Sequence, residues 1–398
     1  MILFTLYILS KIIRKLPGMI IHRIPLPKPT VLEGFQTRNQ IGDICQNAGY
    51  QRVVIITDDT LFRIGFHSAV QDSLEKHGIA CSIFHDIASE PTPAVVEAAR
   101  KLVLAEEAQC IIALGGGSVL DASKMVAASA RMPKRSVKSM MVKFLFMKKQ
   151  TLPIISVPST AGTGAESTVG TVMTSAKGKK CATVIVGLNV TNVVLDCELS
   201  MRAPRSVTAA CGIDALSHGL EGCVADVKSS PSDVEKSMEC VRLVMENLPK
   251  VMENPDDIPA RQAMCKAAFL GGNAINKQLA GYVHAVAHSI GAHYHIAHGK
   301  AIALSLLPVM RFQQPSCLPK LRDVSVYCGL ADATDSPSAA ADKLLAALEQ
   351  LLEKCGLTGS EKIVSPADYP QLALMIFLDS INYSAPIVMR RREIISIL

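Results

Sequence analysis

Histidines and one aspartate gather in the second half of the chain with the spacing of a metal site. Six of the ten histidines lie between positions 218 and 298, five of them within fifteen consecutive residues. Asp214 and His218 are four residues apart, as are His284 and His288, and this spacing puts two side chains on one face of a helix. His298 follows in the tetrapeptide Ala-His-Gly-Lys. In a chain with few histidines elsewhere, this grouping predicts a metal site.

The separation of two of these histidines constrains the helix that carries them. His284 and His298 are 14 residues apart, which along one straight helix is about 21 Å. No single ion is bound by both across that distance, so if both are ligands the helix has to break between them. We expect the turn at Gly291. His293 and His295 would then lie in the connection and serve structural or supporting roles.

The types of these side chains narrow the chemistry. A carboxylate with imidazoles and no thiolate suits Fe²⁺ or Zn²⁺, and the sequence does not choose between the two. A divalent cation with an open coordination position polarises a bound alcohol or carbonyl oxygen, which hydride transfer requires. The twelve cysteines form no CxxC pair, which disfavours thiolate zinc sites and thioredoxin-type chemistry. They are expected to be reduced, buried thiols, which favours a cytoplasmic location.

Two domains are expected to position these groups. Four apolar runs, separated by helical patterns, predict a parallel sheet that is covered on both faces; they are residues 53–56, 111–114, 154–157 and 193–195. After about residue 200 the strand signals stop, and helical spacing takes over in 234–251, 260–280 and 340–354. The prediction is an α/β domain at 25–200 and an all-helical domain at 201–398.

Two glycine- and hydroxyl-rich loops follow predicted strands. In 115–118 three glycines and a serine open a helix, where backbone N–H groups suit a pyrophosphate. The second loop is 158–166. Each has a plainer alternative: Ser118 with Asp121, and Thr163 with Glu166, could simply cap the next helix. Together the loops favour a dinucleotide, although the candidate ribose-binding acid, Asp58, precedes the glycines instead of following them, which disfavours an ordinary Rossmann dehydrogenase.

Four segments resemble the iron-containing (group III) alcohol dehydrogenase family: GGGSVLDASK (115–124), PSTAGTGAES (158–167), GIDALSHGLE (212–221) and YVHAVAHSIGAHYHIAHGKA (282–301). The resemblance runs from about residue 28 to near the C-terminus. It implies the fold shared with dehydroquinate synthase-like proteins, a dinucleotide-binding α/β domain followed by a helical metal-binding domain, and a homodimer.

The resemblance also implies roles for individual residues. Asp214, His218, His284 and His298 match the family's metal ligands. His288 matches a histidine near the nicotinamide and is the expected catalytic proton relay. Asp58 matches an acid that accepts the adenosine ribose, which favours NAD, with NADP as the alternative. The other expected cofactor contacts are Gly116, Gly117, Ser118, Asp121, Thr160, Thr163 and Lys180.

The expected function is therefore a metal-dependent, NAD(H)-linked alcohol dehydrogenase or aldehyde reductase that acts on a primary alcohol or its aldehyde. One alternative keeps the fold but changes the chemistry, as in glycerol-dehydrogenase-like or dehydroquinate-synthase-like enzymes. Another is a non-catalytic protein with a closed structural ion, for which four ligands would suffice.

Charge and composition bear on partners. With 41 basic against 35 acidic residues, 4% aromatics and no tryptophan, the chain gives no reason to expect a nucleic-acid partner.

Residues 1–24 predict an amphipathic helix, too short to span a membrane, that packs on its own or a neighbouring subunit; contact with a membrane surface is the less favoured alternative. Residues 131–150 hold seven Lys or Arg and no acid. They are expected to form a solvated loop or helix, with an anion-docking patch as the alternative.

Overall fold

The computed structural model describes residues 24–88, 90–175, 178, 180–358, 364–381 and 383–398. The described chain forms two compact units, Ile24–Ala203 and Pro204–Leu398, against predicted domains of 25–200 and 201–398. The predicted amphipathic helix at 1–24 lies, but for Ile24, outside the described residues.

The first unit is built on a six-stranded, all-parallel sheet with the order β1-β9-β6-β4-β2-β3. The four predicted apolar runs are its four central strands, whereas the two edge strands, which are only partly buried, were not predicted. The strands are β1 (Thr30–Gly34), β2 (Arg52–Ile56), β3 (Ala80–Phe84), β4 (Cys110–Gly115), β6 (Ile154–Pro158) and β9 (Val190–Asp196).

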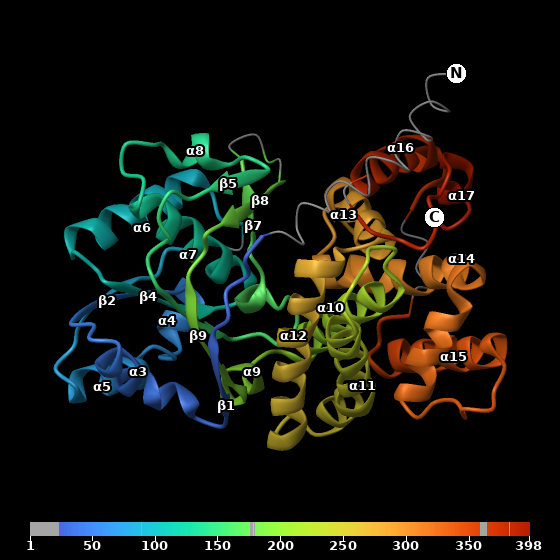
Figure 1. The fold of residues 1–398 in the computed structure, drawn as a ribbon, viewed down its shortest axis with the longest axis horizontal. Coiled ribbons are helices and arrows are strands. Elements are labelled where there is room, and N and C mark those ends of the chain that lie inside the picture. The colour runs from blue at the N-terminus through green and yellow to red at the C-terminus, as the bar shows by residue number, and fades with distance from the viewer. Residues whose placement is uncertain (1–23, 89, 176–177, 179, 359–363, 382) are drawn as a thin grey trace. The chain divides into compact units, whose positions relative to one another are not determined.

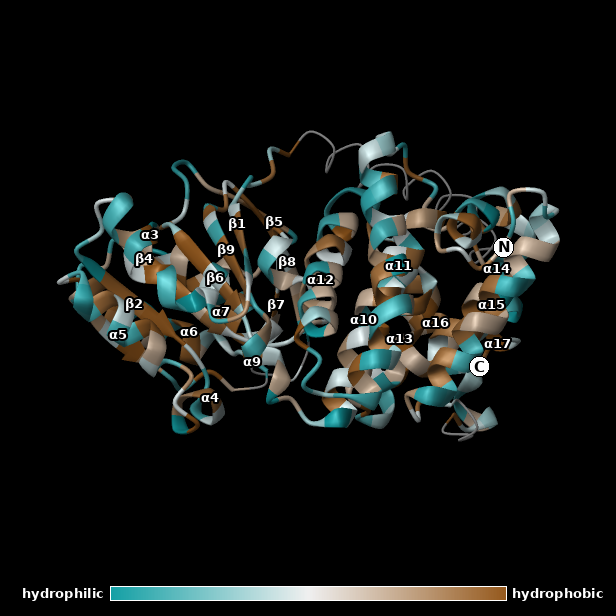
Figure 2. Ribbon diagram, turned by 90° about the horizontal axis from the view of Figure 1, so that it is seen from below, coloured by the Kyte–Doolittle hydropathy of each residue, from teal (hydrophilic) through white to brown (hydrophobic). Residues whose placement is uncertain are grey.

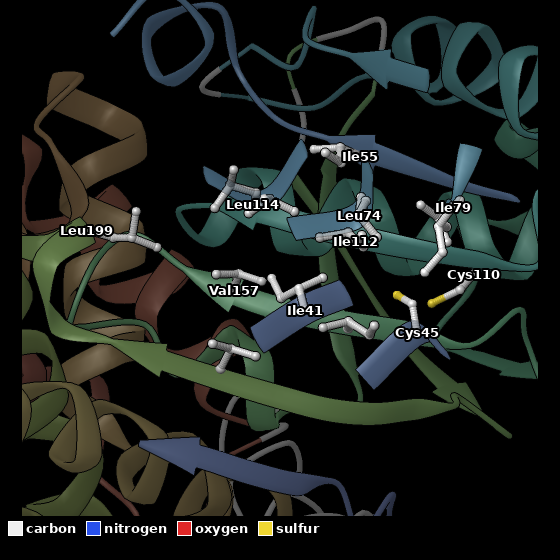
Figure 3. Packing of buried hydrophobic residues seen from close by; sticks show 14 residues of the cluster. Ile41, Cys45, Ile55, Leu74, Ile79, Cys110, Ile112, Leu114, Val157 and Leu199 are labelled. Carbon is white, nitrogen blue, oxygen red and sulfur yellow. The ribbon is translucent and has the colours of Figure 1, made fainter. Parts of the chain in front are cut away.

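Helices cover both faces of this sheet (Figure 1). On one face, α3 (Ile41–Asn47) and α5 (Ser68–Lys76) pack against alternate residues of the strands and form the hydrophobic cluster of Figure 3. On the other face lie α6 (Pro93–Ala105) and α7 (Gly117–Ala130). The central strands β2, β4 and β6 are correspondingly hydrophobic along nearly their whole length (Figure 2), because helices cover both of their faces.

A smaller sheet joins β5 (Phe144–Phe146), β8 (Lys180–Val186) and β7 (Gly170–Thr174) in the order β5-β8-β7. β5 comes from the basic segment 131–150, which also contains the one-turn helix α8 (Val137–Met140). The expectation of a solvated loop or helix for this segment is therefore incomplete. The segment also forms a short strand in which Leu145 is buried and the phenylalanines before and after it are more exposed.

The second unit contains helices and no strand among its described residues. Its helices are α10 (Arg205–Val224), α11 (Pro231–Glu253), α12 (Ile258–Gln278), α13 (Tyr282–Tyr294), α14 (His298–Tyr327), α15 (Pro337–Lys354), α16 (Tyr369–Ser380) and α17 (Arg391–Ile395). α10 packs against α11, α12 and α14 (Figure 1) and is buried on nearly all sides from residue 212 onward, so it forms the centre of this unit. The predicted fold class, a parallel α/β unit followed by a helical one, is confirmed.

Within the described part of the chain, none of the helices combines the length and the hydrophobicity needed to cross a lipid bilayer. The cytoplasmic location and the homodimer stay predictions.

Candidate active site

The buried helix α10 carries three ionisable side chains on one face. Asp214, His218 and Glu221 are spaced by four and three residues, and each is at most 5% exposed. Buried charged groups of this kind are stable only when they are paired with one another or with an ion. The first two were predicted metal ligands, whereas Glu221 was not singled out.

The break between His284 and His298 occurs as predicted, but at a different residue. α13 ends at Tyr294, its C-cap His295 adopts a left-handed conformation with φ 54°, and α14 begins at His298. The predicted turn at Gly291 is wrong, because Gly291 lies within α13 and its carbonyl accepts a hydrogen bond from the Ile296 amide (3.2 Å). A Cβ on Gly291 would lie 3.3 Å from the Ile296 carbonyl oxygen, so the glycine makes room for the returning chain.

A second glycine brings the start of α14 against α10. A Cβ on Gly299 would lie 2.6 Å from the Ala210 Cβ and 2.8 Å from its carbonyl oxygen, distances that real side chains do not adopt. Because Gly299 has no side chain, the first turn of α14 approaches α10 closely. This approach places His298 beside Asp214, one turn further along α10.

Three imidazoles converge on one carboxylate oxygen. Oδ1 of Asp214 lies 3.4 Å from Nε2 of His298, 3.6 Å from Nε2 of His284 and 3.7 Å from Nε2 of His218. Ligand atoms that bind one ion tetrahedrally at about 2.1 Å lie about 3.4 Å from one another. The donor atoms of Asp214, His284 and His298 all fall within 4.8 Å of one another. The spacing is therefore that of ligands around a common cation.

Unsatisfied polar atoms support the same interpretation. Among the described residues, Oδ1 of Asp214 and Nε2 of His284 are buried without a hydrogen-bond partner. The rings of His218 and His284 stack with their centroids 4.7 Å apart. Leaving such atoms buried and unpaired is costly, and a divalent cation between them would satisfy them. The residues present thus fit the metal that the sequence predicts.

The electrostatics of the cluster also favour a cation. Burial opposes charge on Asp214, but the surrounding imidazoles outweigh it and hold the pKa of Asp214 well below its ordinary value. Burial lowers the pKa of His218 to about 4, so its imidazole is neutral and able to bind a metal. Burial also opposes charge on His284, yet Glu221 and Asp214 flank its ring and raise the pKa of His284 to about 10. Two carboxylates thus favour positive charge at this point, as a proton or as a metal ion.

Glu221 orients one of the predicted ligands. Its Oε2 accepts a 2.6 Å hydrogen bond from Nδ1 of His284, and its Oε1 accepts one from the Val283 amide at 2.6 Å. With the proton on Nδ1, the lone pair of His284 is on Nε2, which faces Asp214. The sequence held a signal for this residue, because position 221 shares the helix face of 214 and 218.

His288 lies beside the donor set without belonging to it. Its ring centroid is 5.3 Å from that of His298 and 5.8 Å from that of His284, and its side chain is 45% exposed. Its Nδ1 is 3.0 Å from the Tyr383 hydroxyl and 3.5 Å from the carboxylate of Asp379. Neither partner was predicted from the sequence, since each stands alone, far along the chain from any histidine.

The two predicted nucleotide loops meet in the first unit. Gly115 at the end of β4 pairs with Pro158 at the end of β6, so the loops start side by side. A Cβ on Gly117 would lie 3.0 Å from Thr163 Cγ2, and one on Gly116 would lie 3.6 Å from Thr160 Cγ2. The structure therefore brings Gly116, Gly117, Thr160 and Thr163 together, at the edge of the sheet where ligands bind in this class of fold.

The capping alternatives for these loops required Ser118 and Thr163 to be the N-cap residues of the elements that follow them. In the structure those N-cap positions are Gly116 and Gly164. Gly116 is the N-cap of α7 and has no side chain with which to cap the helix, and Ser118 lies in the first turn. Asp121 instead accepts hydrogen bonds from the Val172 amide (2.8 Å) and from Nζ of Lys124 (3.1 Å), which ties α7 to β7. In the second loop the Thr163 hydroxyl accepts a hydrogen bond from the Ala165 amide (3.3 Å), at the start of a short 3₁₀ turn (Ala165–Ser167) that contains Glu166. α7 thus starts from a glycine N-cap, and the N-terminus of a helix of this kind suits a phosphate.

Two further predicted contacts lie on other elements. Asp58 follows β2, the neighbour of β4, and its Oδ1 caps α4 (Asp59–Arg63) by accepting from the Leu61 amide at 2.9 Å. Asp58 therefore lies at the same sheet edge as the glycine loop. Lys180 begins β8, and its Nζ forms an exposed ion pair with Glu90 (3.2 Å).

The second loop carries a buried acid, Glu166, that the sequence suggested only as a capping residue. Glu166 is 2% exposed, and among the described residues its Oε1 has no hydrogen-bond partner. Burial raises the pKa of Glu166 to about 7, although the nearby ammonium of Lys124 opposes this. The loop that carries Thr160 and Thr163 is therefore anchored by a carboxyl group that titrates near neutrality.

Comparisons with known proteins place these two units in one family. The family models described as "Iron-containing alcohol dehydrogenase" and "Fe-containing alcohol dehydrogenase family, C-terminal" match residues 28–196 and 208–398. The NAD-dependent methanol dehydrogenase of Bacillus methanolicus is 28% identical over 93% of this chain and 97% of its own. The bifunctional aldehyde-alcohol dehydrogenase AdhE of Escherichia coli (strain K12) is 29% identical over 81% of this chain, which spans only 39% of that longer relative.

Solved structures agree with the sequence matches. The crystal structure of a 1,3-propanediol oxidoreductase superposes with a TM-score of 0.87 and 27% identity, over 94% of this chain and 98% of that one. These matches confirm the predicted family and the predicted class of enzyme, an oxidoreductase of the alcohol dehydrogenase type. The chain belongs to the iron-containing alcohol dehydrogenase family.

Proposed function

We propose that the protein interconverts a primary alcohol and its aldehyde with NAD(H) and a divalent metal ion. The observation that carries the proposal is the convergence of three imidazole Nε2 atoms, at 3.4–3.7 Å, on Oδ1 of Asp214. His288, a side chain able to exchange a proton, lies beside this cluster. Similarity to an NAD-dependent methanol dehydrogenase and to a propanediol oxidoreductase supports this class of substrate and cofactor.

The metal would be held by Asp214, His218, His284 and His298, with Fe²⁺ as the family's ion and Zn²⁺ as the alternative. When bound, such a cation polarises the oxygen of an alcohol or aldehyde. The protein contributes the orientation of His284, which Glu221 fixes, and the burial of Asp214, His218 and His284, which strengthens electrostatic interactions; His298, at 39% exposure, is the ligand open to solvent.

The dinucleotide would bind at the two loops of the first unit. When bound, the nicotinamide accepts or donates the hydride. The N-terminus of α7, beginning with Gly117 and Ser118, offers backbone donors to the pyrophosphate, with Thr160 and Thr163 beside it. Asp58 would accept the ribose hydroxyls through the oxygen that does not cap α4, and its charge would repel a 2′-phosphate.

Two of the predicted cofactor contacts take on modified roles in this proposal. Asp121 supports the site indirectly, because its carboxylate joins α7 to β7. Lys180 would have to exchange its exposed partner Glu90 for the cofactor, which an exposed ion pair permits because it is worth little in water.

His288 would move the proton. In alcohol oxidation its Nε2 accepts the hydroxyl proton of the substrate while the hydride leaves the carbon, and in aldehyde reduction the same nitrogen returns the proton to oxygen. Its partly exposed side chain allows exchange of this proton with solvent.

The test is reconstitution with a panel of short aldehydes. Protein stripped with a chelator should not oxidise NADH, and addition of Fe²⁺ or Zn²⁺ should restore NADH oxidation together with one bound metal per chain. His284→Ala should lose both metal and activity, whereas His293→Ala, a histidine of the same helix that pairs with Asp368 instead, should keep both. A metal-replete wild type that oxidises no NADH with any aldehyde would refute the proposal and favour a structural ion.

A further inference from the structure

A tyrosine and an aspartate near the C-terminus contact the proposed proton-carrying histidine. The Tyr383 hydroxyl lies 3.0 Å from Nδ1 of His288, and the Asp379 carboxylate lies 3.5 Å from the same nitrogen. The two partners come from the end of α16 and the loop that follows it, whereas His288 belongs to α13, and the two helices pack together. None of the motifs that identify the family includes either partner.

The protonation of Tyr383 determines which groups donate and which accept among these three side chains. Burial, together with the nearby carboxylate of Asp379, raises the pKa of the Tyr383 phenol well above its ordinary value, so the hydroxyl keeps its proton. The carboxylate of Asp379 is the acid beside this hydroxyl and is therefore the acceptor available to its proton. The Tyr383 oxygen is then left as an acceptor, and the group that faces it is Nδ1 of His288.

We infer that Tyr383, backed by Asp379, is a positioning residue that holds the proton of His288 on Nδ1 and so presents an unprotonated Nε2 to the substrate. The inference rests on the proposed function, since it assigns a direction to the proton transfer by His288. In this arrangement His288 Nδ1–H would donate to the Tyr383 oxygen, 3.0 Å away, and the Tyr383 O–H would donate to Asp379. An imidazole with its proton fixed on Nδ1 can accept a second proton only at Nε2. Catalytic triads use the same arrangement, in which an acid fixes the tautomer of the histidine.

A purely structural contact is the competing explanation, and the same unit supplies a control for it. Tyr294 donates a 2.7 Å hydrogen bond to Asp368, which also lies 3.5 Å from Nε2 of His293. This second group has the same three residue types but lies outside the metal donor set. Tyr294→Phe therefore removes an equivalent tyrosine–aspartate hydrogen bond without touching His288.

Steady-state kinetics on the metal-loaded full chain provide the first measurement. Tyr383→Phe should lower kcat for alcohol oxidation, the direction in which Nε2 has to accept a proton, about tenfold or more, while the KM values for NAD⁺ and alcohol and the metal content change less than about threefold. Asp379→Asn should have a similar effect, and the double variant should be little worse than either single one, because the two residues act through one nitrogen. Tyr294→Phe should keep the wild-type kcat. Wild-type kcat in Tyr383→Phe, or strictly multiplicative losses in the double variant, would overturn the inference.

The ring nitrogens of His288 provide a second measurement that does not depend on turnover. In Zn²⁺-loaded protein with ¹⁵N-labelled histidine, the His288 signals are identified by their loss in His288→Gln. They should show a protonated Nδ1 in the wild type and in Tyr294→Phe, and a mixture of tautomers in the Tyr383→Phe/Asp379→Asn variant. An unchanged tautomer in that variant overturns the positioning role even if the enzyme is active. A wild type inert toward every aldehyde, with the tautomer shift still observed, would refute the proposed reaction while leaving the positioning role in place.

Discussion

Glu221 accepts a 2.6 Å hydrogen bond from Nδ1 of His284, so a carboxylate that binds no metal itself decides which nitrogen of a proposed ligand faces Asp214. The other oxygen of Glu221 accepts from the Val283 amide in the first turn of α13. One buried side chain thus joins α10 to α13 and fixes a ligand at once. The proposed metal centre therefore depends on a residue that its proposed ligand set does not include.

Replacing Glu221 with glutamine should weaken metal binding. Both Glu221 oxygens accept hydrogen bonds, whereas a glutamine amide has one acceptor and would turn its NH₂ group toward a donor. Loss of such a supporting partner typically costs 10- to 100-fold in metal affinity. We expect a decrease of about this size for Zn²⁺, measured by competition with a chromophoric chelator.

The matched control is Asp368→Asn, because Asp368 also pairs with a histidine of α13, His293, outside the donor set. Its Zn²⁺ affinity should equal that of the wild type. Equal affinities in Glu221→Gln and the wild type would show that Glu221 only joins the two helices.

Gly299→Ala should damage both stability and metal binding. The new Cβ would lie 2.6 Å from Ala210 Cβ, so α14 would have to shift away from α10. Overpacking of this kind costs about 1–3 kcal/mol, and His298 would move from Asp214 with the helix. We expect a lower Tm and weaker Zn²⁺ binding in the same variant. Gly170→Ala, whose Cβ would meet nothing within 4 Å, is the control; a Zn²⁺ affinity preserved in Gly299→Ala would mean that the helix shift spares the site.

The sequence predicted the central strands of the large sheet because they are continuous apolar runs of a length typical of strands. β1 and β3 escaped because an edge strand is partly exposed and mixes polar with apolar residues. The three-residue strand β5 was not predicted for a different reason. It lies in a basic segment that resembles a solvated loop, and only the burial of Leu145 in the folded protein shows that one side of the segment packs inward. Burial of that kind is a tertiary property, which local pattern does not contain.

The ligands of the candidate site were accessible from the sequence because they occur in closely spaced pairs. Their supporting residues were less so. Glu221 shares a helix face with Asp214 and could have been included, but Tyr383 reaches His288 across 95 positions of chain. The turn was misplaced at Gly291 because glycine is the common residue for such a reversal, whereas here His295 adopts the left-handed conformation instead.

Asp58→Asn should relax the preference for NADH over NADPH. Asparagine caps helices as well as aspartate, so the hydrogen bond to the Leu61 amide and the stability of α4 should persist. What is lost is the negative charge that would repel a 2′-phosphate. We expect the ratio of kcat/KM for NADPH to that for NADH to rise about tenfold, which corresponds to about 1.4 kcal/mol.

The neighbouring Asp59→Asn provides the control for this change in cofactor preference. Asp59 pairs with Arg63 on the surface of α4, and its replacement removes the same charge one residue away. The ratio of kcat/KM for NADPH to kcat/KM for NADH should rise in Asp58→Asn and stay near the wild-type value in Asp59→Asn. If both shift the ratio equally, the effect is a general one of surface charge and Asp58 is not the selective residue.

Glu166→Gln should change how stability depends on pH. Burial raises the pKa of Glu166 to about 7 in the folded protein from an ordinary value near 4.5, so the folded state holds this proton more tightly than the unfolded state. The stability of the wild type therefore falls as pH rises from about 4.5 through 7, by up to about 3 kcal/mol from this group, and changes no further above that range. Glutamine does not titrate, so the free energy of unfolding of the variant should rise relative to that of the wild type across this window and keep that gain at pH 8.

Urea unfolding of the metal-free proteins from pH 5 to 8 measures the difference in free energy of unfolding, in which the contributions of the titrating metal ligands cancel. The exposed Glu75→Gln is the control, with no expected pH-dependent gain. A stability difference between Glu166→Gln and the wild type that stays constant from pH 5 to 8 would show that Glu166 is ionised throughout in the folded protein, with Lys124 stabilising its charge.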